Sequence, residues 1–142
     1  MKTLWALLAA LAAGVGIAIA AANAEKEDKK VDQRVFELRT YYAAPGKMDA
    51  LHARFRDHTN KLFVKHGMTL IGYWSPTDPK QAEEKMIYIL AYPSKEAADK
   101  SWKGFRDDPE WNEARTASEK DGKLVEKVES VYLNLTDYSP MK

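Results

Sequence analysis

The stretch from Val35 to Trp74 constrains this chain most, because in order it has the pattern of a strand, a turn, an amphipathic helix, a helix stop and a second strand. Alternating residues predict a strand over 35–42, with Phe36, Leu38 and Thr40 on one face. The turn falls at 44–46, and Gly67 is suited to end the helix. The helix is predicted over 47–65 from an apolar stripe at three- and four-residue spacing: Met48, Leu51, Phe55, Leu62 and Phe63.

The rest of the chain repeats this pattern more loosely. Strands are predicted over 68–74, 86–92 and about 128–136, with a polar hairpin loop over 77–85. Ser94 is a suitable N-cap for a helix over 95–106, and Asp108-Pro109 is the start signal of a shorter helix. The order β-α-β-β-α-β predicts an α+β, ferredoxin-like fold. We expect a four-stranded antiparallel sheet with the first and third strands in the middle and the helices on one face.

The strands over 86–92 and 68–74 indicate more than a monomer. The first is apolar at both parities and the second nearly so, whereas a sheet with one wet face should alternate. Two helices cover only one face of such a sheet. We therefore predict that a second copy covers the other face and that the homodimer is a closed α/β barrel. The alternative is a monomer in which Tyr73, Tyr88 and Tyr92 tolerate water.

The N-terminal residues do not belong to this fold. Lys2 precedes an uncharged run over 4–22, and Ala22-Asn23-Ala24 is a typical cleavage site, so residues 1–24 are predicted to be a signal peptide. Export to the periplasm or the extracellular space follows, with no other membrane contact. The alternative is an uncleaved membrane anchor. Residues 25–34 are highly charged and are expected to be a disordered lead-in to a domain over 35–142.

Composition excludes several classes of function. Cysteine is absent, which excludes disulfides, thiolate metal sites and a cysteine nucleophile. The net charge of +1 gives no reason to expect nucleic acid as a partner. The sequence also contains no G-x-G-x-x-G, P-loop or G-x-S-x-G motif. No cofactor is expected.

Three histidines lie on or just after the first helix, but their spacing is unsuited to a metal site. His52 and His66 share a helix face about 21 Å apart, so no metal is expected. His58 flanks the apolar stripe and is the best candidate for acid–base chemistry, at the seam between helix and sheet. Arg39 and Tyr41 are the other catalytic candidates. The alternative for His58 is a half-buried side chain bonded to a strand carbonyl.

Aromatic residues are the second candidate feature. Most are expected in the core, as is typical of strand and helix aromatics. The functional interpretation is a crevice between helix and sheet that binds a flat or apolar small molecule. Its candidate ligand-binding residues are Trp74, Tyr88, Trp102 and Phe55.

Five separate stretches carry a resemblance to a known family: Glu37–Leu51 (ELRTYYAAPGKMDAL), Phe63–Trp74 (FVKHGMTLIGYW), Met86–Tyr92 (MIYILAY), Asp108–Trp111, and 135–140. In order and together they resemble the NIPSNAP family over nearly all of the chain after the leader. The resemblance implies the dimeric α/β-barrel superfold and little chemistry, because the family has no agreed enzymatic activity. The short single domain behind an export signal departs from the family's better-known members.

Two classes of function follow. The first is an exported NIPSNAP-like homodimer that binds a small apolar ligand or a protein partner. The second is a cofactor-free enzyme, of monooxygenase or isomerase type, that uses His58 with a nearby tyrosine or Arg39. A haem-degrading variant is a third hypothesis, and it requires His58 or His66 at an open pocket mouth.

Overall fold

A computed structural model describes residues 34–141 of the chain. The predicted leader (1–24) and all but Arg34 of the predicted lead-in (25–34) lie outside the described residues. Within them, four strands form one antiparallel sheet in the order β2-β3-β1-β4. The strands are β1 (Val35–Ala43), β2 (Thr69–Trp74), β3 (Lys85–Tyr92) and β4 (Val125–Leu133). The prediction of an α+β sheet with the first and third strands in the middle is confirmed, and the order is compatible with a ferredoxin-like fold.

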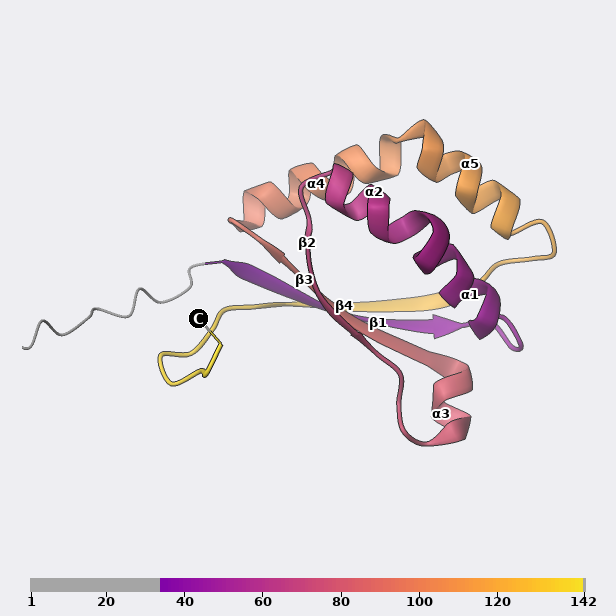
Figure 1. The fold of residues 1–142 in the computed structure, drawn as a ribbon, viewed down its shortest axis with the longest axis horizontal. Helices are drawn as coiled ribbons and strands as arrows, with labels where there is room; N and C mark the ends of the chain where they lie inside the picture. The colour runs from indigo at the N-terminus through magenta and orange to yellow at the C-terminus, as the bar shows by residue number, and fades with distance from the viewer. Residues whose placement is uncertain (1–33, 142) are drawn as a thin grey trace, which may run out of the picture.

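The helices lie over one face of the sheet (Figure 1). They are α1 (Met48–Arg54), α2 (Asn60–Lys65), α4 (Lys95–Asp107) and α5 (Pro109–Ser118). A π-helical segment, Phe55–Thr59, joins α1 to α2 and makes them one continuous helical element. Gly67 follows with a φ of 83°, which favours glycine and lets Met68 N–H donate to the Phe63 carbonyl at 3.0 Å.

The loop predicted over 77–85 is wrong, because the structure has a short helix there, α3 (Pro79–Glu84). Asp78 caps it by accepting from the Gln81 backbone N–H at 2.9 Å, and Pro79 takes the first turn, where no N–H is needed. This is the same start signal as Asp108-Pro109 in α5. The helix buries none of its residues, so it has no apolar stripe that could have predicted it.

The last strand also differs from its predicted range of 128–136, since β4 begins and ends earlier. Its register with β1 explains the end: Leu133 pairs with Phe36, next to the first residue of β1. Residues after Leu133 therefore have almost no strand left to pair with. Alternation within β4 remains as predicted, with Ser130 and Tyr132 on one face.

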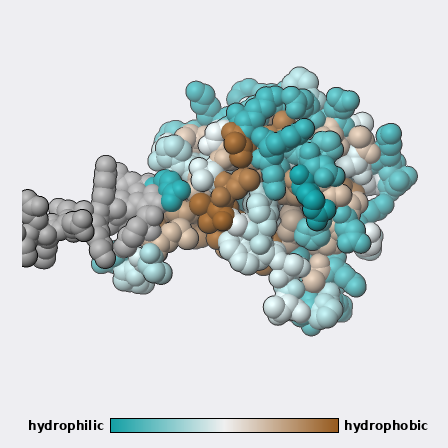
Figure 2. Space-filling view, in the orientation of Figure 1, coloured by the Kyte–Doolittle hydropathy of each residue, from teal (hydrophilic) through white to brown (hydrophobic). Residues whose placement is uncertain are grey.

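The core lies between the sheet and the helices. Phe63 and Leu51 from the helical layer and Tyr88 and Leu90 from β3 are all fully buried. Around Phe55 the rings meet mostly edge to face, for example at 5.3 Å from Tyr88. Figure 2 shows mostly hydrophilic surface over the helical layer and a hydrophobic patch beside it, near β2.

The opposite face of the sheet carries no layer of long helices within residues 34–141 (Figure 1). Cross-strand rows place apolar side chains there: Val131 pairs with Leu38, which pairs in turn with Ile89. Trp74 pairs with Ile87 on this face and is 49% exposed. We call this surface the open sheet face.

Candidate functional site: a cleft over a buried carboxylate

The site begins with a carboxylate inside the sheet. Strand alternation turns Glu37 toward the helices, where it is fully buried. Its Oε2 accepts from the Tyr92 hydroxyl and from Trp102 Nε1, both at 2.7 Å. Its Oε1 accepts from Arg39 Nη1 at 2.5 Å and from Ser130 Oγ at 2.6 Å. One carboxylate therefore links β1, β3, β4 and α4.

These contacts keep Glu37 ionised. Burial by itself would raise the pKa of this carboxyl, but hydrogen bonds from Ser130, Tyr92 and Trp102, together with the charge of Arg39, outweigh it. The net pKa of Glu37 is below its usual value. Its negative charge is matched within the cluster by the Arg39 guanidinium.

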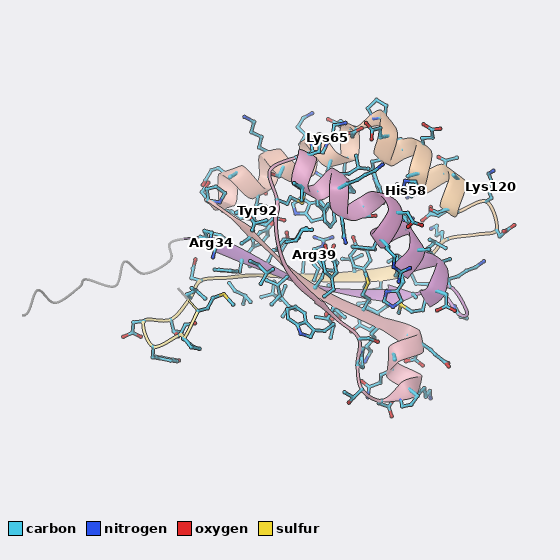
Figure 3. All side chains as sticks on the ribbon, in the orientation of Figure 1. Arg34, Arg39, His58, Lys65, Tyr92 and Lys120 are labelled. Carbon is cyan, nitrogen blue, oxygen red and sulfur yellow. The ribbon has the colours of Figure 1, made fainter. Side chains whose placement is uncertain are left out.

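Arg39 is the cation of this cluster. Its side chain is 16% exposed, and its guanidinium lies over the Trp102 ring with 4.2 Å from Cζ to the centroid. Its Nε is buried and has no hydrogen-bond partner among the residues the structure describes. Figure 3 shows Arg39 and Tyr92 between the sheet and the helices. Arg39 is thus fixed in place while retaining unused donor capacity.

Arg39 and Trp102 lie in the wall of a cleft of about 830 Å³ between the sheet and α4–α5. Tyr132 and Ser130 of β4 form the sheet side, and Trp111 and Arg115 of α5 form part of the helix side. A smaller hollow of about 280 Å³ adjoins it and shares Tyr41, Phe105, Trp111 and Arg115. We call the two together the α4–α5 cleft. A concave site with aromatic walls and polar groups held in fixed positions is typical of small-molecule sites.

The three catalytic candidates do not lie together. Arg39 and Tyr41 both line the α4–α5 cleft. His58 is exposed instead and lines a separate hollow with Lys61 and residues of α5, including Glu113. Its predicted place at the seam between helix and sheet is wrong. The prediction assumed a regular α-helix, whereas His58 lies in the π-helical segment, which turns less per residue and moves His58 further from the apolar stripe.

The four ligand-binding candidates are also divided. Trp102 lines the main cleft and Phe55 lines the adjoining hollow. Tyr88 is fully buried in the core and packs against Tyr41 at 5.3 Å between ring centroids. Trp74 lies on the open sheet face. Trp74, Tyr88 and Trp102 therefore do not line one crevice.

Sequence reasoning missed Glu37 and the α5 residues Trp111 and Arg115. A signal for Glu37 was present, because it has the same strand parity as Arg39 and Tyr41, opposite the apolar Phe36 and Leu38. Its partners are distant in sequence, 65 residues away for Trp102 and 93 for Ser130. Only the fold brings them to the carboxylate.

A second polar cluster surrounds Asp108, the N-cap of α5. Its carboxylate contacts His66 Nε2 at 2.6 Å and Lys65 Nζ at 2.9 Å and accepts from Glu110 N–H. Hydrogen bonds from Lys65 and His66 hold the pKa of Asp108 well below its usual range. Gly104 lies so close to His66 that a Cβ there would be 2.8 Å from Nδ1. Both ring nitrogens of His66 are therefore occupied or closely packed, which suits a structural role.

Residues 34–141 contain neither a metal-binding cluster nor a membrane-spanning helix. No group of three or more histidine, aspartate or glutamate side chains there is placed to hold a metal ion. No helix in that range is both long and apolar enough to cross a membrane.

The fold is similar to those of several proteins of known structure. A crystal structure of a NIPSNAP family protein of unknown function from Agrobacterium tumefaciens matches with a TM-score of 0.66 at 21% identity, covering 78% of this chain and 96% of that one. A second A. tumefaciens NIPSNAP family protein matches with a TM-score of 0.66 at 22% identity, covering 77% and 99%. An uncharacterised NIPSNAP-like domain protein from Burkholderia xenovorans matches with a TM-score of 0.64 at 17% identity, covering 77% and 90%.

At these identities the structural matches show the fold alone. No curated protein matches the chain. The family model described as NIPSNAP matches residues 36–140, which is most of the sequence and nearly all of the part that the structure describes. The chain therefore belongs to the NIPSNAP family.

Proposed function

We propose that this chain is an exported, homodimeric NIPSNAP protein that binds a small molecule in the α4–α5 cleft. The observation that carries the proposal is the cleft itself, with Arg39 fixed in its wall by the buried Glu37 carboxylate. A buried charge is costly unless it is paired and hydrogen-bonded. A cluster of this kind beside a cleft of about 830 Å³ is typical of a preorganised binding site.

The proposed dimer uses the open sheet face. Val131 is 54% exposed, Trp74 49% and Leu133 40%, all on this face. Together with the apolar rows from β1 and β3, they form a surface that is typical of an interface rather than of a solvated sheet. A second copy of the same face supplies a complementary apolar surface by symmetry.

Paired valine variants test the dimer. Val131 lies on the open sheet face and Val64 on α2, with similar exposures of 54% and 57%. Val131→Glu should give a monomer in light scattering after gel filtration, because a carboxylate would be desolvated in the interface. Val64→Glu should remain a dimer. A Val131→Glu protein that dimerises as well as the parent, or a monomeric parent, would overturn this part of the proposal.

Native mass spectrometry of protein purified from its own host tests the small-molecule function. A retained mass that is lost on denaturation, and that is absent from an Arg39→Lys variant, is the expected result. A clean parent protein, together with failure to bind any of a set of aromatic and apolar compounds, would contradict it. N-terminal sequencing of the same material tests export, since cleavage after Ala24 is expected.

The enzymatic alternative receives less support from the geometry. It relied on His58 acting with Arg39 or a tyrosine, and His58 lines a different hollow from Arg39 and Tyr41. The haem alternative required His58 or His66 at an open pocket mouth. His66 Nε2 contacts Asp108 instead, and Gly104 packs closely against its Nδ1. His58 does line an open hollow, but this hollow is about 280 Å³ and is lined by charged and alanine side chains, which do not suit haem.

A further inference from the structure

We infer that the ligand of the α4–α5 cleft is a carboxylate with a flat apolar body, and that Arg39 is the residue that binds its carboxylate. This inference rests on the proposed small-molecule function and adds the chemical class of the ligand.

The charge of the lining favours an anion. Three carboxylates line the two parts of the cleft: Glu37, Asp99 and Glu119. Six cations line the same surfaces: Arg39, Arg54, Lys103, Arg106, Arg115 and Lys123. The whole chain carries a net charge of only +1, so this excess is local. Glu37 repels an incoming anion least, because four donors already bind its carboxylate.

The geometry of Arg39 favours a planar, bidentate anion. Only Nη1 bonds to Glu37, and no bond from Nη2 occurs among residues 34–141, so the terminal nitrogens can still donate to a ligand in the cleft that Arg39 lines, whereas Nε is enclosed by protein. A guanidinium presents its remaining N–H groups as a fork that matches the two oxygens of a carboxylate. The Trp102 ring at 4.2 Å holds the guanidinium plane, and Trp102 is itself held by its bond to Glu37. Glu37 is therefore a positioning residue for both side chains.

The walls favour a flat apolar body. Trp111 lies where the main cleft meets the smaller hollow and packs on Phe105 at 4.4 Å between centroids. Tyr41 lines both parts, and Tyr132 lines the main cleft from β4. Aromatic rings of this kind contact a flat ligand with little loss of side-chain entropy. The combined site suits a compound of two or three rings.

A pair of matched probes tests the inference by isothermal titration calorimetry. The probes are 2-naphthoate and 2-naphthamide, which share the ring system and differ in charge. We expect the parent protein to bind naphthoate at least about tenfold more tightly than the amide, which corresponds to one good charge-assisted hydrogen-bond pair. Arg39→Lys retains a cation for Glu37 but loses the fork. It should weaken naphthoate binding about tenfold and leave naphthamide nearly unchanged.

Arg56→Lys is the matched control, because Arg56 is exposed on the π-helical segment and lines neither part of the cleft. It should bind both probes like the parent. If Arg39→Lys does not fold, Arg115→Gln replaces it: this side chain lines both parts of the cleft and is 57% exposed. It should weaken naphthoate binding selectively, by about threefold, as expected for a solvent-screened charge.

The outcomes separate the two proposals. Equal binding of both probes would overturn the carboxylate requirement and leave small-molecule binding in place. Naphthoate selectivity that survives in both Arg39→Lys and Arg115→Gln would overturn the assignment of the site. Binding of neither probe at millimolar concentration would overturn the inference, and a clean native mass spectrum would then count against the small-molecule function as well.

Discussion

The space between the sheet and the helices is filled differently over the two halves of the sheet. Beneath α1 and α2, strands β2 and β3 face a dry aromatic core in which Phe63, Tyr88 and Leu62 are at most 1% exposed. Beneath α4 and α5, strands β1 and β4 face the Glu37 cluster and the α4–α5 cleft. Every residue of β4 except Val125 is exposed, so the helices do not close over this edge of the sheet.

This difference shows that the fold keeps its dry core apart from the α4–α5 cleft. The dry half fills its volume and supplies hydrophobic free energy. The half with the cleft leaves β4 uncovered and instead holds its elements together through one carboxylate with four partners. Such a network fixes the side chains that it joins, at the cost of burying charge. Substitutions in the two halves should therefore have different signatures.

Phe63→Ala should have the largest effect on stability, because Phe63 is fully buried and packs against Trp102 and Phe105 at 5.3 and 4.8 Å between centroids. We expect a loss of about 3–5 kcal/mol in the free energy of unfolding, measured by urea denaturation. The neighbouring Val64→Ala, 57% exposed in the parent, should stay within about 0.5 kcal/mol. A loss below about 1 kcal/mol for Phe63→Ala would mean that the dry half is not the main core.

Glu37→Gln should have the next largest effect, and it should act on both stability and the cleft. The amide NH₂ must face either Arg39 or Trp102, and both of these groups are donors only. One donor therefore loses its acceptor, and the expected loss in the free energy of unfolding is about 1.5–3 kcal/mol. Binding of 2-naphthoate should weaken too, because Arg39 is no longer fixed.

Glu126→Gln is the control, since Glu126 is exposed on β4 and its change should be nearly neutral in both assays. A Glu37→Gln protein as stable as the parent would show that the carboxylate cluster does not hold the cleft together.

The dependence of stability on pH should report on the Glu37 carboxylate, which lies beside the cleft and not in the dry core. The folded-state pKa of Glu37 is lowered by its partners, so its contribution is fully present above the unfolded pKa of about 4.3. It is lost as the pH falls from there through the folded pKa. Glu37→Gln should therefore lose less stability than the parent below about pH 4. The Asp108 and Glu119 carboxyls also have lowered pKa values. The free energy of unfolding of Glu37→Gln should therefore still fall with decreasing pH, but less steeply than that of the parent. Identical pH profiles in the two proteins would contradict this account.

The sequence predicted the dry half better than the cleft, for a physical reason. The spacing of apolar residues indicates which face of a single helix or strand is buried. The stripe that includes Phe55 and Phe63 therefore predicted the buried face of the first helix. The helix α3 was missed because it buries nothing. His58 was misplaced because it lies in the π-helical segment, which turns by a smaller angle per residue than an α-helix.

The cleft depends instead on pairings across the fold. Arg39, Tyr41 and Trp102 could be chosen from residue type, but their grouping could not. Ser130 reaches Glu37 only because β4 pairs with β1 in the register that sets it opposite Arg39. No local pattern around Glu37 contains that information. The sequence showed only that an acid, Glu37, lies two residues before Arg39 on the same face of the strand.

Tyr73→Phe should have the smallest effect, and its sign distinguishes the two halves. Tyr73 stacks on Tyr88 at 5.4 Å, and its buried hydroxyl has no hydrogen-bond partner among the described residues. Burial raises the pKa of Tyr73, so the hydroxyl stays protonated and uncharged. Removing an unpaired buried hydroxyl should leave the free energy of unfolding unchanged or raise it by up to about 1 kcal/mol. Tyr92→Phe, at the end of β3 that reaches the Glu37 cluster, removes a 2.7 Å donor to Glu37 and should lower the free energy of unfolding by about 1.5 kcal/mol or more. Equal changes in the two variants, measured by urea denaturation, would contradict this comparison. They would show that a tyrosine hydroxyl contributes the same free energy in the dry core as beside Glu37.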